Sequence, residues 1–64
     1  MTEVVIQQIL KVRDSGETNM FDMNKVFQIA MQQEFYELAD YLLEHKASYT
    51  QFILTGKIPD NENE

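Results

Sequence analysis

The sequence predicts an all-α fold: a compact bundle of four short helices over residues 1–56, followed by a disordered acidic tail at residues 57–64. Two observations support this prediction. Four stretches of the chain repeat their apolar residues at the three- and four-residue spacing of an amphipathic helix. The two glycines, Gly16 and Gly56, follow the first and the last of these stretches, where glycine commonly ends a helix.

The first helix is expected over residues 2–13, with Thr2 as its N-cap. When successive residues are placed about 100° apart, Gln7, Gln8 and Lys11 fall on the side opposite the apolar arc. That arc is formed by Val5, Ile6, Ile9, Leu10 and Val12. An arc of this breadth predicts a helix with one buried face.

The loop at residues 14–22 is expected to be a capped joint between the first two helices. Asp22 is a suitable N-cap for the second helix, because its carboxylate can accept from the free amides of the first turn. The spacing of Phe21 and Val26 predicts a hydrophobic staple that sets the direction of the chain. Met20 is expected to fold back over the core.

Arg13 at the end of the first helix and three residues of this joint, Glu17, Thr18 and Asn19, are candidates for an interaction surface. Arg13 falls near the middle of the apolar arc, at the end of the helix. Its stem can pack while its head reaches the C-terminal carbonyls, or its guanidinium can bind loop carbonyls or pair with Asp22. Thr18 and Asn19 can bond their own backbone.

The second helix is expected over residues 23–33, and its apolar side chains cover an arc of roughly 200°. They are Met23, Val26, Phe27, Ile29, Ala30 and Met31. Such a wide arc predicts contacts on two sides, so this is either the central helix of the domain or one side of a dimer interface. The methionines are interpreted as adaptable core residues, with partner binding as the alternative.

The third helix is expected over residues 35–45. Its apolar face comprises Phe35, Leu38, Ala39, Leu42 and Leu43. Glu37, Asp40 and Glu44 line the opposite face, and Tyr41 lies at the boundary. We interpret the acidic stripe as a solvated face. The alternatives are a surface that docks a partner or imitates phosphates, and a site for a hard cation, although such sites usually draw their oxygens from loops.

The fourth helix is expected over residues 47–55, capped by Ser48 or its neighbour. Its shared apolar face comprises Tyr49, Phe52 and Ile53. Leu54 and, on the first helix, Val4 lie outside the apolar faces. These two side chains and the wide arc of the second helix predict a homodimer. Self-association also suits a chain of 64 residues that has no cysteine, because so small a domain has a marginal core.

The composition argues against several classes of function. The net charge is −6 and the five Lys and Arg residues are scattered, so there is no basic patch for nucleic acid. No apolar run approaches the roughly 20 residues of a membrane span, and the N-terminus lacks the features of a signal peptide. One histidine, His45, and no cysteine provide neither a nucleophile–base pair nor a metal site. We therefore expect a cytoplasmic protein that is not an enzyme and has no metal or cofactor.

Two blocks of the sequence, Arg13-Asp14-Ser15-Gly16 and Thr18-Asn19-Met20-Phe21-Asp22, resemble a small uncharacterised family of phages and prophages of Gram-positive bacteria. The likeness extends over about residues 6–56. In that family a glycine usually precedes the Phe-Tyr pair, where this chain has Gln33-Glu34. The resemblance implies a phage origin and the cytoplasm of an infected bacterium. It implies no activity, because the family is a domain of unknown function.

The leading hypothesis is a small non-enzymatic protein of a phage that binds a host or phage protein, as a regulator or an inhibitor of a host or defence protein. The alternatives are a nucleic-acid-binding regulator of helix-turn-helix type and a structural or assembly component of the phage. The acidic stripe of the third helix argues against nucleic acid, because phosphates repel it. The candidate interaction surface comprises Arg13, Glu17, Thr18, Asn19, Glu37, Asp40, Tyr41 and Glu44.

Overall fold

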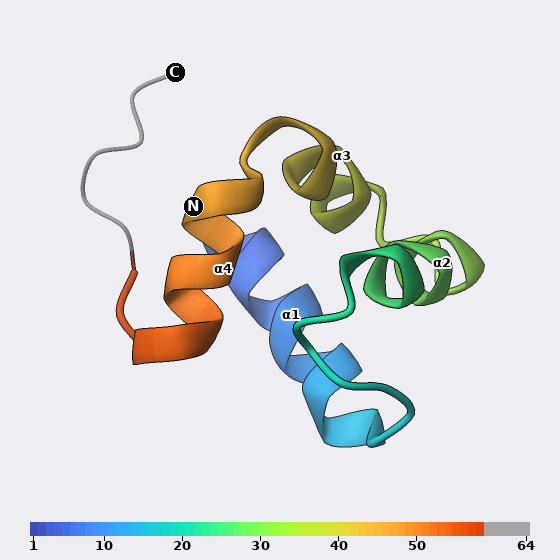
Figure 1. Cartoon of the computed structure of the whole chain (residues 1–64). Coiled ribbons are helices and arrows are strands. Elements are labelled where there is room, and N and C mark those ends of the chain that lie inside the picture. The colour runs from blue at the N-terminus through green and yellow to red at the C-terminus, as the bar shows by residue number, and fades with distance from the viewer. Residues whose placement is uncertain (59–64) are drawn as a thin grey trace.

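A computed structural model describes residues 1–58, and these residues form four helices and no strand (Figure 1). The helices are α1 (Glu3–Ser15), α2 (Met23–Gln32), α3 (Tyr36–Glu44) and α4 (Lys46–Thr55). The predicted all-α bundle of four helices is confirmed. The predicted disordered tail falls outside the described residues from residue 59 onward, while Lys57 and Ile58 are exposed.

The helix α3 is the centre of the bundle. It packs against α1, α2 and α4, and α1 also packs against α2. Figure 1 shows α2 and α4 on opposite sides of α1. Of the two alternatives for the second helix, the central position is therefore the one that the structure contradicts. Its arc is narrower than the sequence indicates, because Val26, Ile29 and Ala30 are buried whereas Met31 is 44% exposed.

The predicted caps are confirmed at both ends of α1 and at the start of α2. The Val5 N–H donates to Thr2 Oγ1 over 3.2 Å, and the Lys25 N–H donates to Asp22 Oδ1 over 3.2 Å. Gly16 ends α1 in the left-handed conformation, with a φ of 67°. Gly56 ends α4 in the same way, with a φ of 75°.

The start of α4 differs from the prediction. The helix begins at Lys46, and no side chain caps it, so neither Ser48 nor its neighbour has the predicted role. His45 is at once the C-cap of α3 and the N-cap residue of α4, with φ and ψ of −135° and 52°. A single non-helical residue therefore separates the two helices, which leaves no room for a longer capped turn.

The core is formed by eleven buried residues drawn from all four helices. They are Val5, Ile9, Val12, Val26, Ile29, Ala30, Leu38, Ala39, Tyr41, Leu42 and Tyr49. Two expectations for the faces of α3 are wrong. Tyr41 is only 8% exposed, so it belongs to the core rather than to a boundary, and Leu43, assigned to the apolar face, is 63% exposed.

Tyr49 connects α4 to the loop that precedes α2. Its side chain is fully buried, and its hydroxyl donates to the Met20 carbonyl oxygen over 2.6 Å. Burial raises the pKa of Tyr49 to about 12, because the core disfavours the phenolate. Met20 packs on the core as predicted, whereas Phe21 is 52% exposed. Met20, and not the predicted staple of Phe21 on Val26, therefore anchors this loop.

Gln8 connects α1 to the start of α3. The sequence places it on the side of α1 away from the apolar arc, but its Oε1 accepts from the Leu38 N–H over 2.9 Å. Its Nε2 donates to Glu37 Oε1 over 2.9 Å. This donor, together with the Glu37 backbone, lowers the pKa of Glu37 below its ordinary value of 4.5. Because Phe35 offers α3 no side-chain cap, Gln8 supplies one from another helix.

The turn between α2 and α3 has the hydrogen bonds of a Schellman motif. The Phe35 N–H donates to the Ala30 carbonyl over 2.7 Å, and the Glu34 N–H donates to the Met31 carbonyl over 3.2 Å. Glu34 adopts the left-handed conformation that this motif requires, with a φ of 63°. It is the one residue other than glycine with a positive φ among residues 1–58. Its side chain therefore makes the turn less favourable than a glycine would.

We expect Tyr49→Phe to lower the free energy of unfolding by about 1–2 kcal/mol, because the Met20 carbonyl loses its donor inside the core. Urea denaturation measures this change. Tyr36→Phe is the matched control, because Tyr36 is 52% exposed, and its effect should stay below about 0.5 kcal/mol. Equal effects of the two substitutions would show that the hydroxyl of Tyr49 does not stabilise the loop.

We expect Gln8→Ala to destabilise the protein by about 1 kcal/mol, because the first turn of α3 loses its cap. The pKa of Glu37 should rise toward its ordinary value, since its side-chain donor is lost. NMR titration of Glu37 follows that rise. Because the folded pKa is lowered, the stability that Glu37 contributes is present above pH 4.5 and is lost as the pH falls. Gln7→Ala is the control, since Gln7 bonds only the exposed Glu3.

We expect Glu34→Gly to stabilise the protein by about 0.5–1 kcal/mol, because glycine adopts a positive φ without steric cost. The neighbouring Gln32→Gly should act in the opposite direction, by about 1 kcal/mol, because Gln32 is helical. Thermal unfolding of both variants tests the pair. A loss of stability in Glu34→Gly would mean that the glutamate side chain has a role that outweighs the backbone strain.

Candidate functional site

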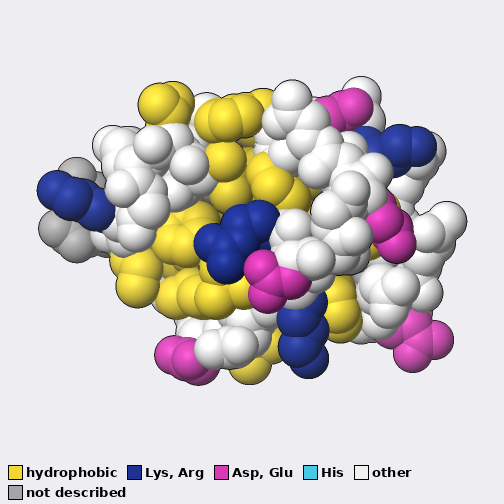
Figure 2. Space-filling view, turned by 90° about the horizontal axis from the view of Figure 1, so that it is seen from below, with side chains coloured by type: hydrophobic (Ala, Val, Ile, Leu, Met, Phe, Trp, Pro, Cys, Tyr) yellow, Lys and Arg dark blue, Asp and Glu magenta, His cyan; other side chains and the backbone are white. Residues whose placement is uncertain are grey.

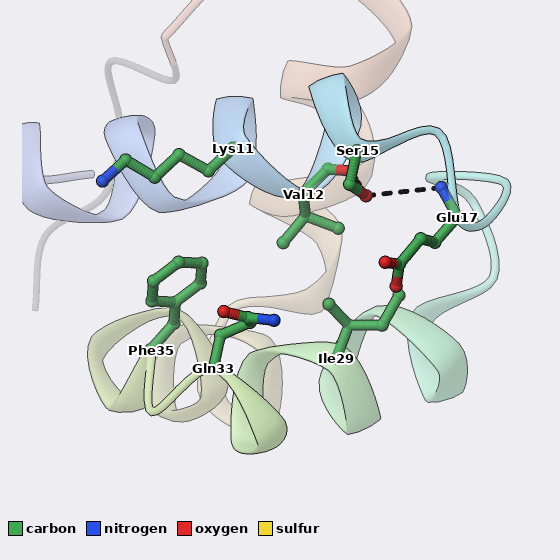
Figure 3. Close-up of a pocket in the computed structure, with 7 residues that line it drawn as sticks. All are labelled: Lys11, Val12, Ser15, Glu17, Ile29, Gln33 and Phe35. Carbon is green, nitrogen blue, oxygen red and sulfur yellow. Dashed lines mark hydrogen bonds between the residues drawn. The ribbon is translucent and has the colours of Figure 1, made fainter.

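A surface hollow of about 200 Å³ lies where the end of α1 faces the turn between α2 and α3. Figure 3 shows the side chains that line it, with Lys11 at one end, Glu17 at the other and Gln33 between them. Val12 and Ile29 supply its apolar wall, and both are buried. The hollow therefore combines an apolar base with charges of opposite sign at its two ends.

A second hollow of about 120 Å³ shares Glu17 and Ile29 with the first and continues along α2. We call the two hollows together the loop groove. Its lining residues are Lys11, Val12, Ser15, Glu17, Lys25, Gln28, Ile29, Gln32, Gln33 and Phe35. The groove holds two lysines and one glutamate, so its local charge is 2 − 1 = +1, in a chain whose net charge is −6.

The local fold fixes the position of Glu17. The Ser15 hydroxyl donates to the Val12 carbonyl over 2.7 Å and accepts from the Glu17 N–H over 3.3 Å (Figure 3). Three residues further on, the Met20 carbonyl is held by Tyr49. The segment with Glu17 is thus bonded on both sides. These bonds also engage the hydroxyl of Ser15, so it is not placed as a free nucleophile.

The charged groups of the loop groove are open to a ligand. Neither Lys11 nor Lys25 forms an ion pair within residues 1–58, and both side chains are exposed. The Lys11 ammonium lies 6.0 Å from the centre of the Phe35 ring, at the outer limit of a cation–π contact. Gln28, Gln32 and Gln33 add amides that can both donate and accept hydrogen bonds. The groove can therefore bind acidic and polar groups.

The structure divides the predicted interaction residues of the loop. Glu17 lines the loop groove. Asn19 accepts from the Phe21 N–H over 2.9 Å, as predicted for a loop residue that bonds its own backbone, and Thr18 is partly buried. Arg13 is exposed and pairs with its neighbour Asp14 over 3.2 Å, so the predicted pair with Asp22 is not the one formed.

The predicted residues of α3 lie apart from those of the loop. Glu37, Asp40 and Glu44 are exposed on α3, whereas Tyr41 is buried in the core. Glu37 is engaged by Gln8. The ring centre of His45 lies 5.0 Å from that of Tyr41. Residues 1–58 contain no group of three or more His, Cys, Asp or Glu side chains that is placed to hold a metal ion.

The loop groove contains residues that the sequence did not single out. Lys25, Gln28 and Gln32 are absent from the apolar arc predicted for the second helix, and Lys11 was placed on the side opposite the apolar arc of the first. One signal was present, because Lys25, Gln28 and Gln32 recur at i, i+3 and i+7 and so form one polar stripe. Nothing in the sequence shows that this stripe meets the end of α1.

A separate groove of about 240 Å³ opens between α1 and α4 and is mainly apolar. Its lining residues are Ile9, Leu10, Arg13, Met20, Phe52, Ile53 and Gly56. Figure 2 views the molecule from the side where α1 and α4 end, and it shows hydrophobic side chains gathered around a Lys or Arg. This α1–α4 groove carries fewer polar groups than the loop groove and so offers less chemical selectivity.

Comparison with known proteins identifies the family and no relative of known function. No match was found among curated proteins or among solved structures. No helix within residues 1–58 is both long and apolar enough to cross a membrane. A family described as a domain of unknown function (DUF5049) matches residues 1–57, which is most of the chain. The chain therefore belongs to the DUF5049 family.

Proposed function

We propose that the chain is a small non-enzymatic protein-interaction module that binds a host or phage protein through the loop groove. The observation that carries the proposal is the pair of lysines, Lys11 and Lys25, that line the groove without ion-pair partners among residues 1–58. The sequence resemblance to phage proteins supports an origin in a phage. A module of this kind acts as a regulator or an inhibitor in the cytoplasm of the infected bacterium.

The shape of the groove favours a protein segment over a small molecule. Its two hollows measure about 200 and about 120 Å³, so each is smaller than the about 300–1,000 Å³ of a usual small-molecule pocket, and together they reach only the lower end of that range. The two hollows adjoin along α2 and share Glu17 and Ile29. A groove of this shape suits successive side chains of one segment better than a single compact ligand.

The chemistry of the groove favours an acidic and polar segment. Carboxylates of the partner would pair with Lys11 and Lys25, and the three glutamine amides would bond peptide groups of an extended chain. Ile29 and Phe35 would cover the apolar parts of the segment. Since the chain as a whole is acidic, the positive charges of Lys11 and Lys25 favour an acidic partner and favour its binding at the loop groove.

Two other functions have less support. For a nucleic-acid-binding regulator, the exposed side of α3 carries Glu37, Asp40 and Glu44, which phosphates repel. A mobility-shift assay with a salt titration tests it. For a structural or assembly component of the phage, no feature of the described residues argues in favour. Detection of the protein in purified virions would promote that role.

The test is a quantitative pull-down from a Gram-positive bacterial lysate with three immobilised proteins: the wild type, Lys11→Glu/Lys25→Glu and Lys46→Glu/Lys57→Glu. Both double variants change the net charge by the same amount, and all four lysines are exposed. We expect a partner that the wild type and the second variant retain and that the first loses by at least about tenfold, a difference of about 1.4 kcal/mol. Equal retention by the two variants, or the absence of any specific partner, would overturn the proposal.

A further inference from the structure

The outer side of α4 is a stripe of uncharged residues that no other helix covers. Ala47, Gln51 and Leu54 are exposed, and they recur at i, i+4 and i+7, which places them on one side of the helix. Leu54 is the most exposed large hydrophobic residue of the described chain, at 66%. The helix α4 packs against α3, and its Phe52 and Ile53 line the α1–α4 groove. We call these three residues the α4 stripe.

The charge distribution favours a second copy of the chain as the occupant of the α4 stripe. Residues 47–56 contain no charged side chain, although 25% of the residues in the chain are charged. Two copies of a chain with a net charge of −6 repel each other over most of their surfaces. That repulsion is weakest where neither copy presents a charge. The α4 stripe is thus a surface on which a second copy meets little electrostatic opposition.

The order of the residues makes the α4 stripe complementary to itself. Along α4 the stripe runs from a small side chain, Ala47, through an amide, Gln51, to a large side chain, Leu54. In an antiparallel pair of helices the second copy presents the same side chains in the reverse order. Ala47 then faces Leu54 of the second copy, so a small side chain accommodates a large one. Gln51 lies at the two-fold axis, where its amide can donate to and accept from the same amide of the second copy.

We propose that two copies of this chain form a symmetric dimer through antiparallel α4 helices, with Gln51 at the two-fold axis. A two-fold dimer uses the same patch on both copies, as the α4 stripe allows. The contact is independent of the loop groove, whose residues belong to α1, α2 and the adjoining turns. It uses Leu54, which the sequence indicated as a dimer contact, and differs from the α2 interface that the sequence left as an alternative, since the buried side of α2 faces α1 and α3.

The length of α4 limits the strength of this dimer. A helix of 10 residues is about 15 Å long, so the contact is smaller than the roughly 1,200–2,000 Å² of a stable complex. We therefore expect a dissociation constant between about 1 μM and 1 mM. Association in this range would vary with the protein concentration, and it would supply part of the apolar burial that so short a chain lacks.

Sedimentation equilibrium between about 10 μM and 1 mM tests the dimer with a matched pair of variants. We expect Leu54→Glu to weaken association by at least about tenfold and Leu43→Glu to leave it unchanged. Leu43 is the fitting control, because it is 63% exposed and lies on α3. Thermal unfolding checks that both variants are folded. A wild type that is monomeric at 1 mM, or a dimer that both variants weaken equally, would overturn the proposal.

A second measurement tests the antiparallel arrangement itself. The chain has no cysteine, so Gln51→Cys introduces a single thiol at the proposed axis. Two thiols at a two-fold axis approach each other closely enough for a disulfide. Under mild oxidation we expect this variant to form a covalent dimer at least about tenfold faster than Gln7→Cys, whose thiol is exposed on α1. Equal rates for the two variants would exclude the proposed pairing.

Discussion

The hydrogen bond from the Tyr49 hydroxyl to the Met20 carbonyl connects α4 to the loop between α1 and α2. Met20 packs on the core beside it, so the loop lies against the bundle at a defined place. Met20 also lines the α1–α4 groove, together with Phe52 and Ile53 of α4. On the other side of the loop, Glu17 reaches the loop groove. The loop that this hydrogen bond holds therefore contributes a residue to each of the two grooves.

The outcome of the sequence predictions depends on how far apart the interacting residues are in the chain. Thr2, Asp22 and the two glycines act within their own helix ends, and their roles could be read from neighbouring residues. Gln8 and Tyr49 bond residues that are 29 or 30 positions away. No periodicity within one helix can predict such a partner, so Gln8 was placed on the side of α1 away from the core.

The candidate site was predicted only in part for the same reason. The sequence identified the loop between the first two helices as part of a candidate interaction surface, and Glu17 of this loop lines the loop groove. The facing wall comes from Lys25, Gln28 and Gln32 of α2, whose position opposite the end of α1 is set by packing through Ile29 and Val12. The acidic residues of α3 form a separate exposed set, and part of it serves the fold, since Glu37 accepts a hydrogen bond from Gln8.

The helix α3 lies between the helices that carry the two proposed surfaces. It packs against both α2, which lines the loop groove, and α4, which carries the α4 stripe. These two helices lie on opposite sides of α1 (Figure 1). Pairing through α4 would thus leave both loop grooves free and would place two of them on one particle. A partner with two copies of its binding segment would then bind both grooves at once. Its overall affinity would exceed that of either single contact, although no new contact residue is needed.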